Sequence, residues 1–300
     1  MLYLQTVLDG LLQGGVYAAV AVGLSLVFGV MRIINWAHGE MLMLSMYVGF
    51  FLYTGLGINP YITVLINAVL FFALGYLFQR GILNPMLQRE KEREPMSILL
   101  FTVGLGYVLS NIALMAFGGN SRAITATFNL GSFVTPNLGL VVSIPKLIAC
   151  VISIAVSMAL FVFLQSSEQG RALRACSQNR EVAKLMGINE QKLYGIAMGL
   201  GLGLVGISGA LLISYFPVTP EVGASFSTKS FVIVVLGGKG SIPGALVGGL
   251  LVGVIETLGS QLFSSSYSQV ILFVLFVIIL LVKPTGCLLY TSDAADDLIG

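Results

Sequence analysis

The amino-acid sequence predicts an all-α integral membrane protein with about eight transmembrane segments. Hydrophobic residues make up 57% of its 300 residues and charged residues only 9%. Charged residues make up about 25% of a typical soluble domain. Apolar runs of about 20 residues, long enough to cross the hydrocarbon core as helices, recur along the chain. Because so few charges are present to face water, lipid must surround most of the protein surface.

Uninterrupted apolar segments are expected to form most of the crossings, within one transmembrane domain at 1–286. They lie at 7–30, 37–57, 61–83, 97–118, 144–165, 193–214 and 267–283. Asn59-Pro60 and Ser143-Ile144-Pro145 are typical of helix starts. Each places a capping side chain before a first-turn proline, whose missing N–H would be unpaired there in any case.

A further apolar region, 226–259, is interrupted by the glycine-rich sequence GGKGSIPG. The sequence allows two arrangements: a re-entrant pair of half-helices, or two short crossings that bring Lys239 to the cytoplasm. Non-helical backbone at membrane depth is tolerated only inside protein or beside a water-filled cavity, so the break indicates a transport pathway. A tight turn that only packs is an equal alternative. The candidate pathway residues here are Gly237, Gly238, Gly240, Ser241 and Gly244.

The basic residues predict an external N-terminus and a cytoplasmic C-terminus, since Lys and Arg gather in cytoplasmic loops. In this orientation eleven of the fifteen Lys and Arg residues lie inside and three, Arg122, Lys146 and Lys229, lie outside. The remaining one, Lys239, falls in the glycine-rich break. Both polar loops, 84–96 and 166–192, are then cytoplasmic.

The loop at 166–192 is a charged, helix-forming region between two apolar segments. Asn179 is placed to cap a short helix that Gly187 ends. The apolar residues of that helix share one face: Val182, Leu185 and Met186. Such a helix either lies on the membrane surface or inserts its apolar face into a groove of a partner. A face only three residues wide anchors weakly in lipid, which favours a protein partner.

His38 and Glu40 are expected just inside the start of the second span. Asn35 is a plausible helix cap, and the helix dipole favours Glu40 in a first turn. The functional alternative is that Asn35, His38 and Glu40 form a gate near the cytoplasmic mouth. A single histidine makes no metal site, and the sequence predicts neither a metal centre nor a catalytic residue.

Glycines at every fourth position, Gly195, Gly199 and Gly203, predict a flat stripe where two membrane helices approach closely. The G-x-G-x-x-G pattern at Gly201, Gly203 and Gly206 lies inside an apolar helix. A dinucleotide site needs that pattern between a strand and a helix, so none is expected.

Three segments resemble ABC-importer permeases of the branched-chain amino acid type. They are GVMRIINWAHGEMLMLSMY at 29–47, EQGRALRACSQNREVAKLMGIN at 168–189 and FVIVVLGGKGSIPGALVGGLLVGVIE at 231–256. They occur in the order of that family and cover nearly the whole chain to about Gly286. The resemblance implies a transport subunit of a bacterial or archaeal plasma (inner) membrane. It implies no cofactor and no nucleotide site in this chain, because partner subunits bind ATP.

The same resemblance implies four partner proteins: a homologous second permease subunit, two ABC ATPase subunits and an extracytoplasmic substrate-binding protein. Membrane lipid surrounds the protein, and no nucleic acid is involved. The implied cargo is branched-chain (hydrophobic) amino acids. The residues expected to couple to the ATPases are Gly170, Arg171, Arg174, Glu181, Ala183, Lys184, Leu185 and Gly187.

Two alternatives stay open. Permeases for urea and short amides share the sequence pattern. The resemblance therefore identifies the family more specifically than it identifies the substrate. A secondary transporter without ATPases would need ion-coupling carboxylates in mid-membrane, where Glu256 is the sole candidate.

The C-terminal sequence at 287–300, CLLYTSDAADDLIG, is acidic and has no span periodicity. It resembles a translated sequencing-library adapter, and we expect it not to be native. A disordered acidic tail is the alternative.

Overall fold

Long apolar helices make up most of the computed structural model, which describes residues 2–89, 96–124, 131–134, 140–238, 240–263 and 265–282. The C-terminal tail at 287–300 and Lys239 lie outside the described residues. The helices are α1 (Leu2–Met31), α2 (His38–Leu56), α3 (Pro60–Phe78), α4 (Asn84–Arg89), α5 (Met96–Phe117), α6 (Ile144–Ser166), α7 (Glu168–Gln178), α8 (Arg180–Leu185), α9 (Glu190–Leu212), α10 (Val222–Gly237), α11 (Ile242–Leu262) and α12 (Ser265–Val282). A π-helical turn, η1 (Gln79–Leu83), joins α3 to α4.

The predicted all-α membrane fold is confirmed. Among the described residues, seven helices are long and apolar enough to span a membrane: α1, α2, the continuous Pro60–Gln88, α5, α6, α9 and α11. Helix α10 is shorter, as is the apolar part of α12. Asn59 caps α3 as predicted, because its Oδ1 accepts from the N–H of Tyr61 at 3.0 Å. A two-stranded hairpin, β1 (Ser132–Val134) and β2 (Val141–Ser143), is the only sheet described.

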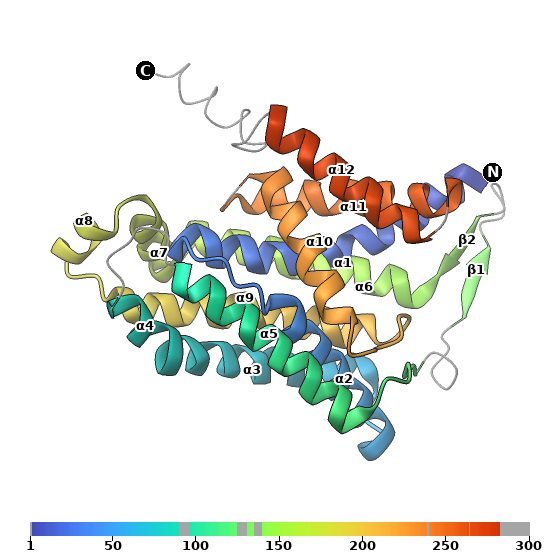
Figure 1. Ribbon diagram of the computed structural model, residues 1–300, viewed down its shortest axis with the longest axis horizontal. Coiled ribbons are helices and arrows are strands. Elements are labelled where there is room, and N and C mark those ends of the chain that lie inside the picture. Colours follow the sequence, from blue (N-terminus) through green and yellow to red (C-terminus); the bar gives the residue numbers. More distant parts are fainter. Residues whose placement is uncertain are drawn as a thin grey trace.

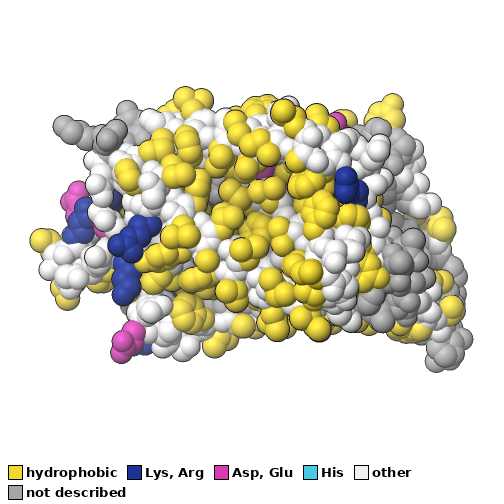
Figure 2. Space-filling view, turned by 90° about the horizontal axis from the view of Figure 1, so that it is seen from below, with side chains coloured by type: hydrophobic (Ala, Val, Ile, Leu, Met, Phe, Trp, Pro, Cys, Tyr) yellow, Lys and Arg dark blue, Asp and Glu magenta, His cyan; other side chains and the backbone are white. Residues whose placement is uncertain are grey.

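The two ends of the bundle differ in character. Helices α4, α7 and α8 lie at one end, and the start of α1 lies with the hairpin at the other (Figure 1). We call these the α8 end and the hairpin end. Hydrophobic side chains cover the middle of the face in Figure 2, and Lys and Arg side chains gather near the α8 end. This distribution is the one expected when lipid surrounds the middle of the bundle.

Helices α1 and α9 form the core, and both are largely buried. Helix α1 packs along α11, α9 packs along α3, and α1 and α9 also touch each other. At the α1–α9 crossing the two backbones nearly touch: a Cβ added to Gly23 would lie 2.6 Å from the carbonyl oxygen of Gly201. Glycine is therefore needed where these central helices meet.

Two non-helical segments, 32–37 and 213–221, run back into the bundle among the described residues. After the first, α2 begins beside the middle of α1, where His38 Nε2 lies 3.0 Å from the carbonyl oxygen of Val20. After the second, α10 begins beside the start of α2, and the N–H of Gly39 donates to Ser227 Oγ at 2.9 Å. The N-termini of two helices thus meet inside the bundle.

These breaks belong to two halves that repeat with inverted direction. The series α1, α2, α3 corresponds to α9, α10, α11. The packing corresponds too: α1 lies on α11 as α9 lies on α3, and α2 lies on α9 as α10 lies on α1. Inverted repeats with discontinuous helices are typical of transporters whose pathway passes between the halves.

The structure also decides how region 226–259 is arranged. Helices α10 and α11 are joined by a turn at the α8 end, where Gly240 touches the backbone of Gly29 and Ser25 Oγ donates to the carbonyl oxygen of Ser241 at 3.3 Å. The break is therefore a turn at one end of the bundle, which joins α10, a shorter helix that begins inside the bundle, to the spanning helix α11. Gly238 has φ +93° and Gly240 has φ +86°, values that favour glycine.

Two predicted placements are wrong. Lys229, assigned to the outside, is 9% exposed and lies within the bundle in α10, because Glu256 pairs with it there. His38 and Glu40 lie at the start of the second span, α2, as predicted, but this start lies beside the middle of α1 rather than near a cytoplasmic mouth. Val20, the partner of His38, is roughly 16 Å from the end of α1 at 1.5 Å per residue.

Candidate functional site

The candidate site is built from an arm at 167–189, made of α7, α8 and the turn that follows, together with a cavity beneath it. The arm begins at Ser167, whose Oγ caps α7 by accepting from the N–H of Gly170 at 2.9 Å. A Cβ on Gly170 would collide with the backbone of Leu164 in α6. The arm therefore turns sharply off α6, and only glycine fits at this point.

Two arginines of α7 hold this turn in place. Arg171 Nη1 donates to the carbonyl oxygen of Ser166 at 2.9 Å. Arg174 donates to the carbonyl oxygens of Leu164 and Gln165. These carbonyls belong to the last turn of α6 and have no helical N–H partner. The arginines supply the missing hydrogen bonds, and their positive charge is favourable at a helix C-terminus. Of the predicted coupling residues, Gly170, Arg171 and Arg174 thus attach the arm to α6.

Helix α8 is attached at its other side to α9. Glu190, the first residue of α9, accepts from Arg180 Nε at 2.5 Å and lies 3.0 Å from Lys184 Nζ. The hydrogen bonds to Glu190 raise the pKa of Arg180, which keeps it charged. Asn179 caps α8 as predicted, accepting from the N–H groups of Glu181 and Val182 at 3.0 and 3.2 Å. The arm is therefore fixed to two spans, α6 and α9.

The tip of the arm presents apolar side chains to the surroundings. Leu185 is 87% exposed and Met186 is 77% exposed, while Ala183 is buried against the bundle. Glu181 and Val182 are exposed as well. Gly187 ends the helix with φ +80°, as predicted. Large exposed apolar groups of this kind are typical of surfaces that contact another protein or the membrane.

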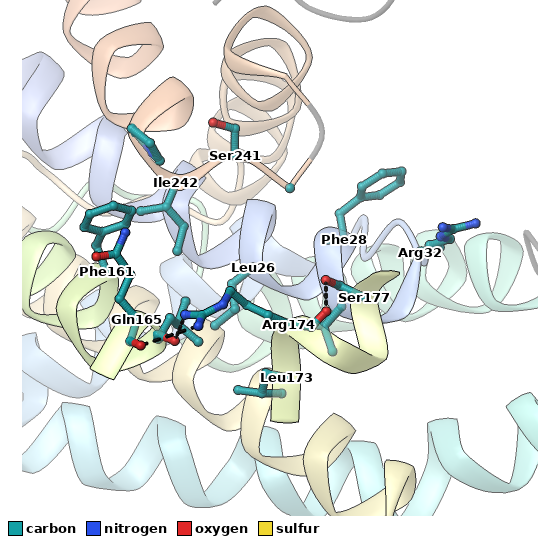
Figure 3. A pocket seen from close by; sticks show the side chains of 15 residues that line it. Leu26, Phe28, Arg32, Phe161, Gln165, Leu173, Arg174, Ser177, Ser241 and Ile242 are labelled. Carbon is teal, nitrogen blue, oxygen red and sulfur yellow. Dashed lines mark hydrogen bonds between the residues drawn. The ribbon is translucent and has the colours of Figure 1, made fainter. Parts of the chain in front are cut away.

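A cavity of about 840 Å³ lies between the arm and the α10–α11 turn (Figure 3). It contains one predicted coupling residue, Arg174, and two predicted pathway residues, Gly240 and Ser241. Apolar side chains of α1, α6, α7 and α11 complete it: Leu26, Phe161, Leu173 and Ile242. Figure 3 shows Arg174 reaching toward the end of α6, with Ser241 and Ile242 across the cavity. The arm and the glycine-rich turn thus line the same cavity.

The remaining pathway candidates form a separate group inside the bundle. Asn35 does not cap α2: the capping position is Ala37, and Asn35 Nδ2 instead lies 3.9 Å from Met198 Sδ. Glu40 is 5% exposed and lies against Gly223 at the start of α10. Its carboxylate therefore lies beside the N-terminus of α10, which helps to offset its burial. The α10–α11 turn is closely packed, since a Cβ on Gly237 or Gly244 would collide with the other residue's backbone.

The glycine stripe of α9 lies against α3. A Cβ on Gly195 would lie 2.8 Å from the ring of Tyr76, and one on Gly199 would lie 3.0 Å from the ring of Phe72. Gly203 has more room, with its nearest neighbour at 3.6 Å. These glycines let aromatic rings of α3 seat directly on the α9 backbone.

The sequence interpretation missed two charged contacts. Glu190 pairs with both basic residues of α8. In the sequence it is recognisable only as an acidic residue that follows the helix cap Asn189, which does not predict these partners. The pair Lys229–Glu256, at 2.7 Å, joins α10 to α11. The sequence indicated this pair more clearly, because Lys229 and Glu256 are opposite charges in two apolar segments. Charged side chains within a membrane generally pair with one another.

The family described as "Branched-chain amino acid transport system / permease component" matches residues 6–280. The branched-chain amino acid permease BraD of Pseudomonas aeruginosa is 33% identical over 298 residues, 95% of each chain. LivH of Escherichia coli K12 is 32% identical over 298 residues, again 95% of each chain.

A more distant relative is the ribose import permease RbsC of Haemophilus influenzae, 28% identical over 53% of this chain and 52% of RbsC. No solved structure matches the chain. The match over most of the chain, together with the multi-pass helical bundle, identifies the family. The protein belongs to the permease components of branched-chain amino acid transport systems.

Proposed function

We propose that the protein is the permease subunit of an ATP-driven importer for branched-chain amino acids, in the plasma membrane of a bacterium or archaeon. One observation carries this proposal: an apolar tip is held out on an arm that is fixed to α6 by Arg174 and to α9 by Glu190. A surface helix that only covered the bundle would bury its apolar face rather than present it. The names of relatives such as BraD and LivH support the cargo.

The proposed assembly has two ATPase subunits on the cytoplasmic side, each docking an α8 tip. A homologous second permease forms the other half of the pore, and an extracytoplasmic binding protein delivers the amino acid. The N-terminus is external, which puts the basic α8 end in the cytoplasm. ATP is bound by the partner subunits alone.

The proposed coupling is mechanical. Closure of the ATPases on ATP pushes α8, and the fixed arm carries the push into α6 and α9. Helix α9 packs on α1 and α3, so it transmits the movement to the centre of the bundle. Across the arm cavity, α7 also faces the α10–α11 turn, where the passage between the two halves opens or closes.

The test is substitution Leu185→Glu in the assembled transporter. The side chain is almost fully exposed, so the protein should fold and reach the membrane. A charge at the centre of an apolar contact should reduce leucine uptake at least tenfold and uncouple ATP hydrolysis from uptake. Gln88→Glu, on an exposed position of α4 outside the arm, is the matched control and should transport normally. Normal uptake by the Leu185→Glu variant would refute the coupling role.

A further inference from the structure

Lys229 and Glu256 form a charge cluster inside the bundle that the coupling route does not use. Lys229 Nζ donates to Glu256 Oε1 at 2.7 Å and to Tyr17 Oη at 3.2 Å. It also lies 5.0 Å from the centroid of the Tyr17 ring and 5.3 Å from that of Phe226. Gln13 Nε2 donates to the same Tyr17 oxygen at 2.6 Å. The cluster thus joins α1, α10 and α11.

The cluster lies within the membrane-spanning part. Glu256 is fourteen residues beyond the start of α11 and six before its end, roughly 21 Å and 9 Å along that helix at 1.5 Å per residue. Ionisable residues at such depth are expensive to bury and generally serve transport rather than stability. A pair of apolar residues would stabilise the contact at least as well.

A second cavity, of about 260 Å³, opens beside Lys229 between α10 and α12. We call it the α10–α12 cavity. Oxygen-bearing side chains, Ser225, Thr228 and Gln269, line it together with Lys229. Val232, Leu272 and Phe273 form an apolar wall. One cation, several hydrogen-bond acceptors and an apolar wall in a small volume match a small molecule with an anionic group and a short apolar chain.

The charge balance of the cluster narrows the class of molecule. Lys229 and Glu256 already neutralise each other, so a bare anion or a bare cation would leave one net charge in a low-dielectric site. A zwitterion adds no net charge. Its carboxylate has a partner in Lys229 and its ammonium group has partners in the side-chain oxygens of Ser225, Thr228 and Gln269. Thr228 is able to accept, because its own hydroxyl already donates to the carbonyl oxygen of Ala224 at 3.1 Å.

We propose that the α10–α12 cavity is a subsite of the permease for a free zwitterionic amino acid, whose carboxylate binds Lys229 and whose apolar side chain lies on Val232, Leu272 and Phe273. Glu256 and Tyr17 are positioning residues: they hold the Lys229 ammonium group, and Glu256 balances its charge. This inference rests on the proposed function, since it names where the permease itself holds the cargo.

The test is equilibrium binding of labelled leucine to the purified permease–ATPase complex, without the binding protein. 3-Methylbutylamine lacks the carboxylate and 4-methylpentanoate lacks the ammonium group. Each should compete at least tenfold more weakly than leucine, because each lost charge-assisted contact is worth about a factor of ten or more. Equal competition by all three compounds would overturn the proposal.

Paired substitutions separate binding from structure. Lys229→Met with Glu256→Gln removes both charges and should weaken leucine binding at least tenfold. The half-buried pair at the hairpin end, Lys146→Met with Asp9→Asn, makes the same change elsewhere and should leave binding unchanged. The exchange Lys229→Glu with Glu256→Lys restores an ion pair. This exchange should recover the thermal stability that Glu256→Gln alone loses, but it should not recover leucine binding. If the pair served structure alone, the exchange would recover both.

The remaining outcomes are distinct. If the complete wild-type transporter takes up no leucine, the proposed function fails. If it takes up leucine but the complex without the binding protein shows no saturable leucine binding, or binds it equally after loss of both charges, this inference alone is overturned.

Phe273→Ala offers a check of the apolar wall, since a larger cavity should improve competition by phenylalanine relative to leucine severalfold. An unchanged ratio would count against the wall.

Discussion

The α7–α8 arm and the α10–α11 contact both depend on an ion-paired glutamate, but they differ in their access to water. Glu190 of the arm holds Arg180 and Lys184, whose side chains are 41% and 51% exposed. Glu256 holds Lys229 in the bundle, where both side chains are under 20% exposed. Water screens the first contact and is largely excluded from the second. The arm is therefore a mechanical attachment that tolerates change, whereas the inner pair penalises any unbalanced charge.

The largest expected difference follows from removing one partner alone. Glu256→Gln leaves the Lys229 ammonium group buried without its counter-charge, which should destabilise the protein by about 3–5 kcal/mol. The double change of the pair should restore most of that loss. Thermal unfolding of the purified permease in detergent measures both, and Asp9→Asn, which frees the more accessible Lys146, serves as control. Equal stability of Glu256→Gln and Asp9→Asn would show that water reaches both pairs alike.

A backbone change at the α10–α11 turn should have an intermediate effect. Gly240→Ala puts a Cβ on a residue with φ +86° and places it 2.9 Å from the Gly29 Cα. We expect a loss of about 1–2 kcal/mol, from the left-handed conformation, before any contribution from the contact. Gly104→Ala, with open space around the new Cβ, should be neutral. Thermal unfolding compares the two, and identical midpoints would contradict the close approach of this turn to α1.

Loss of the ion pairs of the arm should change the coupling of ATP hydrolysis to leucine import more than it changes the stability of the protein. Glu190→Gln removes the counter-charge of Arg180 and Lys184, and partly exposed pairs contribute only about 1 kcal/mol or less. We expect an almost unchanged unfolding temperature, together with a lower ratio of leucine imported to ATP hydrolysed. Glu168→Gln, an exposed acidic residue at the start of α7, is the control. A stability loss as large as that of Glu256→Gln would remove the contrast between the two regions.

The smallest effect concerns a thiol on the arm. Burial and the charge of Glu190 raise the pKa of Cys176, which is 3% exposed. Less thiolate is then present at a given pH, so maleimide labelling of Cys176 should be slow at pH 7 and accelerate with rising pH. A cysteine at the exposed position 185 should react faster at every pH. Mass spectrometry of labelled protein measures both rates, and equal rates would show that α7 does not pack on the bundle.

The helices and the arm were predictable because their causes are local. Apolar length defines the spans, Asn59 and Asn179 cap α3 and α8, and Gly187 ends α8. The predicted spans already leave connections near 32–37 and 213–221. That these connections run back into the bundle was not predicted, because it arises from the meeting of α2 with α10. The depth of His38 and of Lys229 depends on that same tertiary contact.

The candidate site was predicted only in part for the same reason. The sequence identifies the residues of the arm, and it also identifies the glycine-rich turn. It does not show that Arg174 shares a cavity with Gly240 and Ser241, since that requires α1, α6, α7 and α11 to converge. Nor does the spacing of charges along the chain show that α8 is tied to α9 by Glu190.

We propose that ATP-driven motion enters the protein through the α8 tip on the cytoplasmic side. The most direct measurement uses Leu185→Cys in a variant without other cysteines and a membrane-impermeant maleimide. We predict labelling in inside-out vesicles of the permease alone, loss of labelling when the ATPases are bound, and no labelling from the periplasmic side. Labelling from the periplasmic side, or labelling that bound ATPases leave unchanged, would contradict the claim.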